Sequence, residues 1–372
     1  MDQEKKYPIA EPDLTGNEIR YVNDAILNEG RISSSGKYLD QFEKYAKQNF
    51  QREFALSCSN GTTALHLALL GLGIGQGDEV IVPTLTFAAT AAVVVHVGGT
   101  PIFVDVKDSD WLIDETKLDS LLTQKTKAII IVDLYGLPCN YEVIEFWCKK
   151  NNIFLIEDSA EAHGAIYKGR KVGSFGDASC FSFFGNKIIT TGEGGIVLTD
   201  NEFLFEKMKV LKNHGTKNPG TYLHEIAGYN YRMTNIQAAI GCAQFERFQE
   251  FLKVRKEHHD LYVSLLDDVP EISFQKFDPN DVTPAYWLET IRLSVPKEDI
   301  MLYLKEKGID TRPVFIPMHK QKAYEQFVNG KSFPNSDRIS SEGLSLPSST
   351  LLNNKDIIYI AQVLKEAIAL SK

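Results

Sequence analysis

The sequence FSFFGNKIITTGEGG, residues 181–195, places Lys187 between an aromatic, strand-like segment and a glycine-rich turn. A lysine in a sequence can simply be a solvated surface charge, but these surroundings favour an amine nucleophile. Such an amine can hold an aldehyde as a Schiff base, which is the resting state of enzymes that use pyridoxal 5'-phosphate (PLP). The stretch therefore predicts a PLP-binding lysine at position 187.

Asp158 supplies the carboxylate that a PLP lysine needs nearby. It follows the apolar run IFLI, residues 153–156, which is typical of a buried strand that delivers its last residues to the ligand-binding edge of a parallel sheet. A carboxylate beside the pyridine nitrogen keeps that nitrogen protonated, so the ring can accept electrons from the substrate carbon. The alternative is a cap for a helix over residues 159–162, and for an isolated aspartate that role would be the commoner one.

Composition limits the classes of protein that the chain can belong to. Its 372 residues, 43% of them hydrophobic, can bury a large core and suggest two domains. The 49 acidic and 40 basic residues give a formal charge of -9, which argues against a nucleic-acid partner. The charged N-terminus and the lack of long apolar runs favour a cytoplasmic protein without a membrane partner. The five cysteines are scattered without a CxxC pair, so we expect buried thiols and no metal site.

Short apolar runs alternate with helix-length segments from about residue 53 to residue 200, which predicts an α/β fold with a mostly parallel sheet covered on both faces. The predicted strands are residues 54–58, 80–82, 102–104, 128–132 and 153–156. A long helix is predicted over residues 235–265, and the change to a smaller domain near residue 245 gives domains of residues 1–245 and 246–372. The N-terminal stretch has no periodicity, so we expect it to pack on another element or on a partner subunit.

Residues 59–62, Ser-Asn-Gly-Thr, follow the first predicted strand and open a helix. Gly61 allows close backbone approach, and the amides of a first helical turn point at a phosphate with the help of the helix dipole. An ordinary helix cap without a ligand is the alternative. The position after a strand of a parallel sheet favours a phosphate site.

These motifs, together with residues 157–164 and 228–233, resemble the DegT/DnrJ/EryC1/StrS family of sugar aminotransferases over nearly the whole chain. The resemblance implies fold type I of the PLP enzymes, which is aspartate aminotransferase-like. That fold has a large doubly wound domain and a smaller C-terminal α+β domain. The resemblance also implies a homodimer whose two active sites each borrow residues across the interface.

The resemblance further implies roles for individual residues. Lys187 would form the Schiff base and move protons, and Asp158 would contact the pyridine nitrogen. Many family members carry Gln where this chain has Glu161, which would contact the phenolic oxygen of the cofactor. The other implied cofactor contacts are Gly61, Thr62 and Ser182 at the phosphate, Phe87 on one ring face, and Asn230 from a second subunit. The implied sugar-nucleotide contacts are Ser33, Ser34, Arg312 and His319. From the residues alone, an aromatic residue at the position of Phe87 is more often a core residue, and His163 is predicted to be structural.

The implied reaction has two half-reactions in ping-pong order. L-glutamate gives up its amino group and leaves as 2-oxoglutarate, and C4 of a nucleotide-linked 4-keto-6-deoxysugar then takes the amine. Residues 135–139 and 311–315 are most similar to members that act on GDP-4-keto-6-deoxymannose, and a 4- or 3-aminotransferase for a dTDP- or UDP-linked ketosugar is the alternative. A dehydrating relative has histidine in place of the lysine, so Lys187 implies transamination.

Two functions from other classes remain open. A nicotinamide-linked oxidoreductase would need a glycine fingerprint that follows a strand and opens a helix, whereas the glycines of residues 71–77 close a helix and precede a strand. A non-catalytic sugar-nucleotide binder would be expected to lose the lysine or the aspartate, and this chain keeps both.

Overall fold

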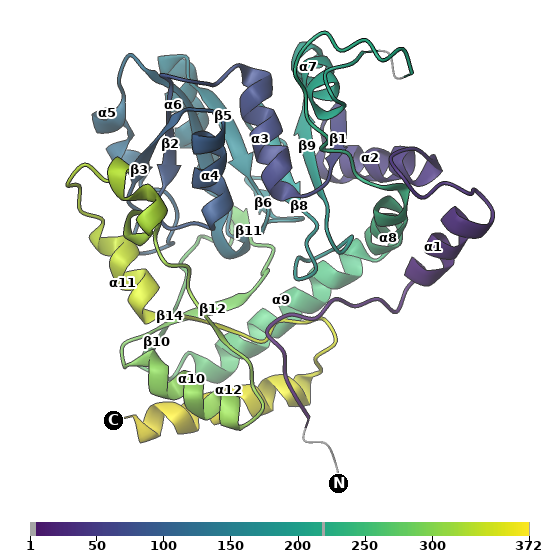
Figure 1. Cartoon of the computed structure of the whole chain (residues 1–372). Helices are drawn as coiled ribbons and strands as arrows, with labels where there is room; N and C mark the ends of the chain where they lie inside the picture. The colour runs from purple at the N-terminus through teal and green to yellow at the C-terminus, as the bar shows by residue number, and fades with distance from the viewer. Residues whose placement is uncertain (1–4, 218–219, 372) are drawn as a thin grey trace.

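A seven-stranded sheet forms the centre of the computed structural model, which describes residues 5–217 and 220–371 (Figure 1). The strand order is β1-β9-β8-β5-β4-β2-β3. The strands are β1 (Phe54–Cys58), β2 (Glu79–Pro83), β3 (Thr100–Val104), β4 (Thr126–Val132), β5 (Phe154–Asp158), β8 (Ala178–Ser182) and β9 (Gly195–Thr199). Neighbours from β8 to β3 pair in parallel, so the predicted mostly parallel sheet is confirmed.

Strand β1 differs from the prediction that it belongs to the parallel part of the sheet. It pairs antiparallel with β9, and β9 also pairs antiparallel with β8. Two reversals restore the direction, so β1 runs the same way as β8 and β5. The carboxyl end of β1 therefore still reaches the edge where Asp158 lies. Residues 59–62 lie at the ligand-binding edge of the sheet, as predicted, although β1 pairs antiparallel with β9.

Alternate residues of the central strands enter two separate cores, because successive side chains of a strand point to opposite faces. In β4, Ile129 and Ile131 belong to one cluster, and Ala128 and Ile130 belong to the other. The helices that cover the sheet are α2 (Lys37–Phe50), α6 (Tyr141–Asn151) and α8 (Asn235–Glu246) on the first face, and α3 (Gly61–Leu72), α4 (Ala88–His96) and α7 (Glu202–Lys212) on the second. Helices on both faces are what the alternating sequence pattern predicts.

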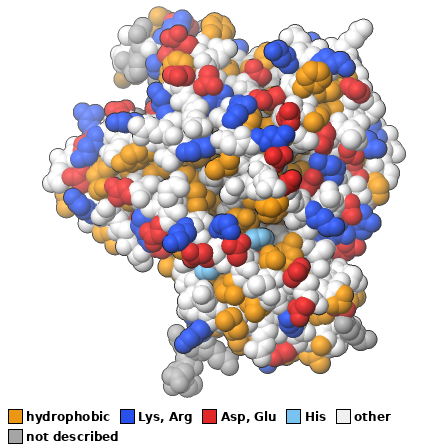
Figure 2. Space-filling model, turned by 180° about the vertical axis from the view of Figure 1, so that it is seen from behind, with side chains coloured by type: hydrophobic (Ala, Val, Ile, Leu, Met, Phe, Trp, Pro, Cys, Tyr) orange, Lys and Arg blue, Asp and Glu red, His pale blue; other side chains and the backbone are white. Residues whose placement is uncertain are grey.

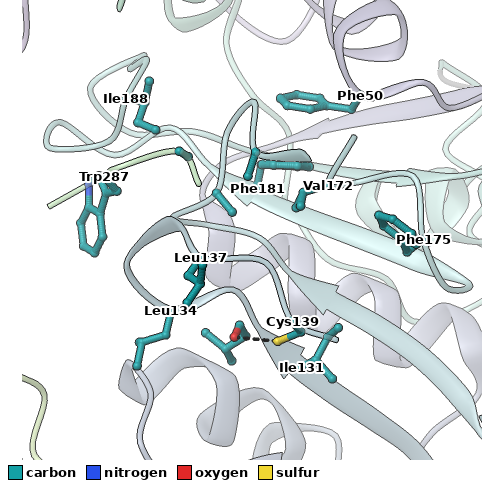
Figure 3. Packing of buried hydrophobic residues seen from close by; sticks show 14 of the residues in the cluster. Phe50, Ile131, Leu134, Leu137, Cys139, Val172, Phe175, Phe181, Ile188 and Trp287 are labelled. Atoms are coloured by element: carbon teal, nitrogen blue, oxygen red, sulfur yellow. Dashed lines mark hydrogen bonds between the residues drawn. The ribbon is translucent and has the colours of Figure 1, made fainter. Parts of the chain in front are cut away.

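Buried thiols and aromatic rings fill part of the first core, which Figure 3 shows from close by. Cys139 Sγ donates to the Val132 carbonyl at 3.2 Å. All five cysteines are free and buried, as predicted. The His163 ring packs against Phe181 and Phe183, with ring centroids 5.1 and 5.2 Å apart, and its structural role stays a prediction because both ring nitrogens are buried without a hydrogen-bond partner among the described residues.

The long helix predicted over residues 235–265 is two helices, α8 and α9 (Phe248–Leu266). Arg247 breaks the run with a non-helical backbone at φ -105° and ψ 7°, and its guanidinium binds Asp13 at 2.8 Å. Phe248 lies in the first core of the large sheet, whereas Tyr262 and Leu266 lie in a third core. Helix α9 thus crosses between the two parts of the molecule, and a domain boundary at residue 246 stays a prediction.

The third core lies between α9 and an antiparallel sheet with the strand order β10-β12-β14-β13. The strands are β10 (Ile272–Phe274), β12 (Glu289–Leu293), β13 (Arg312–Pro313) and β14 (Gly343–Leu346). The remaining helices are α1 (Glu18–Leu27), α5 (Leu118–Leu121), α10 (Lys297–Glu306), α11 (Pro334–Glu342) and α12 (Asn354–Leu370). The N-terminal segment packs on this part, because Tyr7 N donates to the Gly308 carbonyl at 2.8 Å. A small three-stranded sheet of β11 (Val282–Thr283), β6 (Ile166–Tyr167) and β7 (Arg170–Lys171) completes the fold.

Acidic and basic side chains alternate over the face that Figure 2 shows, without an extended basic field. This distribution agrees with the formal charge of -9. Within the described residues, no helix is both long and apolar enough to cross a membrane.

Candidate active site

A cavity of about 420 Å³ opens at the carboxyl edge of the large sheet. The ends of β5 and β8, the first turn of α3 and the loop after β8 form most of its wall, and residues 287–288 and 312–315 close it from the other part of the molecule. Ligand sites of open α/β sheets occur at this edge. The cavity therefore lies where the strand pattern predicts a site.

Lys187 lies inside this cavity on the loop between β8 and β9, with its side chain 11% exposed. Its Nζ atom lies 3.8 Å from Glu161 Oε1 and 3.7 Å from the centroid of the Trp287 ring. Burial lowers the pKa of the lysine, while the charges of Glu161 and Asp158 act against that shift. A buried amine with a lowered pKa is suited to act as a nucleophile or a base.

Asp158 ends β5 and faces the same cavity. Its Oδ2 atom accepts a hydrogen bond from Thr90 Oγ1 at 2.7 Å, and Thr90 is bonded in turn to Thr86 at 2.8 Å. Burial raises the pKa of the carboxyl, against the effects of Thr90 and Lys187. The alternative of a helix cap fails here because no helix begins over residues 159–162.

Glu161 lies between Lys187 and the turn after β4. Its Oε2 atom accepts from the Tyr135 backbone N–H at 2.7 Å, which leaves Oε1 to face the lysine. Burial raises the pKa of this carboxyl, and the charge of Lys187 lowers it. Two carboxyls and one amine thus share a single buried space.

The floor of the cavity has an anion-binding character at the start of α3. Asn60 caps this helix through Thr63 N at 2.9 Å, and the amides of Gly61 and Thr62 have no acceptor within the described chain. A Cβ atom on Gly61 would lie 2.8 Å from Ser182 Cβ, so only glycine lets this turn approach the serine so closely. Free amides at a helix N-terminus beside a hydroxyl fit a phosphate group.

Aromatic rings form one wall of the cavity. Tyr135 stacks on Trp287 with centroids 6.1 Å apart, and on Phe315 with centroids 5.6 Å apart. Phe315 also packs against Phe87, which lines the cavity but is 58% exposed. Figure 3 shows Trp287 on the same side of the core as Ile188, next to the lysine in sequence. The wall offers flat apolar surface to a planar ring.

The cavity brings together most of the predicted cofactor residues. Those that line it are Gly61, Thr62, Phe87, Asp158, Glu161, Ser182 and Lys187. Of the predicted substrate contacts, Arg312 lines it, and its guanidinium has no carboxylate partner within the described residues. Ser33, Ser34, Asn230 and His319 do not line this cavity, and the first three are exposed.

His319 instead joins the two parts of the molecule. Its backbone N–H donates to Thr84 Oγ1 at 3.2 Å, so the threonine hydroxyl can donate to His319 Nδ1 at 2.8 Å. Its Nε2 atom lies 2.8 Å from Asp337 Oδ1, and its ring stacks on Phe333. Both ring nitrogens are therefore engaged in holding the segment that carries Arg312 and Phe315.

We expect His319→Ala to loosen this segment and to raise the KM for the substrate by up to about thirtyfold, since two hydrogen bonds of about 1 kcal/mol each are lost. Asp337→Asn should act in the same direction, although Asp337 does not line the cavity. Lys320→Ala removes only an exposed ion pair with Asp337 and should change KM less than twofold. Steady-state kinetics check this, and an unchanged KM in both His319→Ala and Asp337→Asn would contradict it.

Sequence reasoning missed three residues that shape the site: Thr90, Tyr135 and Trp287. Thr90 follows Thr86 by four residues, a spacing that places both hydroxyls on one side of a turn. Tyr135 has a left-handed backbone with φ 56°, which aims its N–H at Glu161. Trp287 lies 100 residues from Lys187 in the chain, and no local pattern links the two.

Comparisons with known proteins agree with this geometry. The profile of the DegT/DnrJ/EryC1/StrS aminotransferase family matches residues 12–365. GDP-perosamine synthase of Escherichia coli O157:H7 is 44% identical over 97% of this chain and 98% of its own. GDP-perosamine synthase of Vibrio cholerae is 41% identical over 92% of this chain and 93% of its own. The PLP form of Spr1654 from Streptococcus pneumoniae superimposes with a TM-score of 0.92 at 29% identity, over 99% of this chain and 100% of that one. The chain belongs to the DegT/DnrJ/EryC1/StrS aminotransferase family.

Proposed function

We propose that this protein transfers the amino group of L-glutamate to C4 of GDP-4-keto-6-deoxymannose and so forms GDP-perosamine. The observation that carries the proposal is the buried Lys187, which shares its cavity with Asp158 and the anion-binding turn at Gly61. The identity of 44% to the Escherichia coli GDP-perosamine synthase, over nearly the whole of both chains, supports the choice of sugar nucleotide.

The residues of the cavity fit PLP as the cofactor. The free amides of Gly61 and Thr62, together with the hydroxyl of Ser182, would hold its phosphate, and Asp158 would contact its pyridine nitrogen. Lys187 would bind its aldehyde carbon. When bound, PLP supplies an electron sink for the pair of electrons released at the substrate carbon.

The side chains of the chain then have distinct tasks. Lys187 Nζ takes the proton that leaves Cα of glutamate, and in the second half-reaction it returns a proton to C4 of the sugar. The hydroxyl of Thr90, which donates to Asp158 Oδ2 at 2.7 Å, favours the charged form of this carboxyl against the effect of burial on its pKa. Trp287 and Tyr135 exclude water from one side of the lysine. Arg312, unpaired at the cavity wall, would bind an anionic group of a substrate.

We also propose that the active protein is a homodimer, in which Asn230 of each subunit reaches the phosphate of the neighbouring site. Asn230 lies outside the cavity of its own chain and is exposed, as a residue donated to a second subunit must be. Its Oδ1 atom accepts from Arg232 Nε at 2.9 Å in the single chain. Ser33 and Ser34 lie in the segment before α2, and they are also exposed and outside the cavity of their own chain. We therefore propose them as contacts of the sugar nucleotide in the neighbouring site.

A substrate panel tests the proposal. We expect purified protein, supplied with PLP and glutamate, to aminate GDP-4-keto-6-deoxymannose with a kcat/KM at least tenfold above that for dTDP- and UDP-linked 4-keto-6-deoxysugars. Mass spectrometry and NMR of the product identify the position of the new amine. Amination of only a dTDP- or UDP-linked sugar would overturn the assignment of substrate and leave the aminotransferase in place.

A further inference from the structure

The contact between Lys187 and Glu161 is the only ion pair of this lysine among the described residues, and both side chains are almost completely buried. The Nζ and Oε1 atoms are 3.8 Å apart, and the exposed fractions of the two side chains are 11% and 6%. A buried carboxylate that faces a buried amine stabilises the charged form of the amine. Lys187 can act as a nucleophile only when its nitrogen carries a free lone pair. The ion pair with Glu161 therefore affects the property on which the chemistry of Lys187 depends.

We propose that Glu161 sets the protonation state of Lys187, so that the amine becomes free to bind the cofactor aldehyde only at a higher pH than in a site without this carboxylate. The inference rests on the proposed function of Lys187 as the residue that binds PLP. It makes Glu161 a positioning residue whose charge controls when the nucleophile is available.

The orientation of Glu161 supports this role. Its Oε2 atom is fixed by the Tyr135 N–H at 2.7 Å, so the carboxylate cannot turn away from the lysine without losing that bond. The unusual backbone of Tyr135, with φ 56°, points the N–H in this direction. The other side of Nζ is covered by the Trp287 ring at 3.7 Å, which also favours a cation.

The other charged groups around the pair do not replace Glu161. Asp158 also favours the ammonium form of Lys187, but its Oδ2 atom is bound to Thr90. Asp133 acts on Glu161 and raises its pKa. Burial lowers the pKa of His163 to about 3, so that this ring stays neutral near the lysine. The charge of Arg255 lowers the pKa of His163 further.

The chemical step that depends on this equilibrium is the addition of the amine to an aldehyde. The ammonium of Lys187 first loses one proton to solvent, which leaves two hydrogens on Nζ. A C–N bond then forms, both hydrogens leave with the aldehyde oxygen as water, and a C=N double bond remains. The rate of this step rises with pH until the amine is fully free.

The variant Glu161→Gln removes the negative charge and keeps an oxygen that can accept from Tyr135. It should therefore lower the pKa of Lys187 without loss of the fold.

Competitive acylation of the cofactor-free full chain with acetic anhydride, read at Lys187 by mass spectrometry between pH 5 and pH 11, tests the proposal directly. We expect the midpoint for E161Q to lie about 1–3 pH units below that of the parent protein, as expected when an opposite charge within 4–6 Å is removed. Glu193→Gln is the matched control, because Glu193 also lines the cavity but is exposed and makes no ion pair with Lys187. The exposed Lys320 in the same digest reports the intrinsic reactivity of the reagent.

A second readout separates this inference from the proposed function. PLP added to the protein over the same pH range should produce visible absorbance. The initial rate at which this absorbance appears should have a pH midpoint that is lower in E161Q than in the parent protein by the same amount as the acylation midpoint. An acylation midpoint in E161Q that equals or exceeds the parent value would overturn the role of Glu161. A shifted acylation midpoint without PLP absorbance in either protein would support the role of Glu161 and overturn PLP binding by Lys187.

Discussion

Lys187→Ala is expected to remove the visible absorbance of bound PLP and to lower kcat by about 10⁴-fold or more, since the variant loses both the nucleophile and the group that moves the proton. The cavity should survive, because alanine leaves the aromatic wall and the anion-binding turn unchanged. Without the ammonium, the buried Glu161 has no positive partner among the described residues, and its pKa should rise further above the usual carboxyl range.

Absorbance spectra and single-turnover assays with glutamate measure this loss. Lys168→Ala is a suitable control, since Lys168 is an exposed lysine paired with Glu142 at 2.5 Å and should leave both readouts unchanged. A Lys187→Ala protein that still aminated the sugar at the parent rate would refute the role of Lys187.

Arg52→Met is expected to lower the free energy of unfolding by about 3–5 kcal/mol, because it leaves a buried carboxylate without its ion pair. Arg52 binds the buried Glu157 at 3.3 Å, with side chains that are 3% and 0% exposed, and its other ion pair is with the exposed Asp200 at 2.7 Å. Its Nε atom also donates to the Gly173 carbonyl at 2.7 Å. Burial raises the pKa of Glu157, while the guanidinium of Arg52 lowers it.

Urea denaturation followed by circular dichroism measures the effect. Arg338→Met, which removes an exposed pair with Asp108, should change the free energy of unfolding by less than about 1 kcal/mol. The double variant Arg52→Met, Glu157→Gln should recover part of the loss, since the uncompensated charge is gone. If the single variant were no less stable than Arg338→Met, the buried pair would not hold this region together.

Those parts of the site that depend on strand ends could be predicted from the sequence. Asp158 and the turn at Gly61 each follow an apolar run, and the carboxyl ends of strands that run in one direction meet at one edge. Lys187 was recognisable from its glycine-rich neighbours. These residues share short-range patterns that need no knowledge of the tertiary structure.

The remaining features come from packing between distant segments. Trp287 reaches Lys187 from the other part of the molecule. Thr90 reaches Asp158 from helix α4, which begins 70 residues before Asp158 in the chain. The antiparallel pairing of β1 could not be read from its apolar residues, because β1 is buried on both faces and so has the continuous apolar run that is typical of parallel strands. His319 illustrates a further limit, since a resemblance suggests a substrate contact where the structure engages both ring nitrogens elsewhere.

The reversed strand β9 has a consequence for how the site can vary. Parallel neighbours must be joined by a long crossover, whereas the antiparallel pair β8 and β9 is joined by a loop that leaves and re-enters the sheet at the same edge. Residues 183–194 of that loop carry Lys187, and its two ends are fixed by hydrogen bonds between Phe183 N and Gly194 O at 2.8 Å and between Thr191 N and Phe183 O at 2.9 Å. Ile188 and Ile189 of this loop are buried in the first core, whereas Phe184 and Glu193 are exposed, so the loop can change at its exposed positions while the register of the sheet stays the same. Engineering of new reaction specificities in this scaffold should begin in that loop.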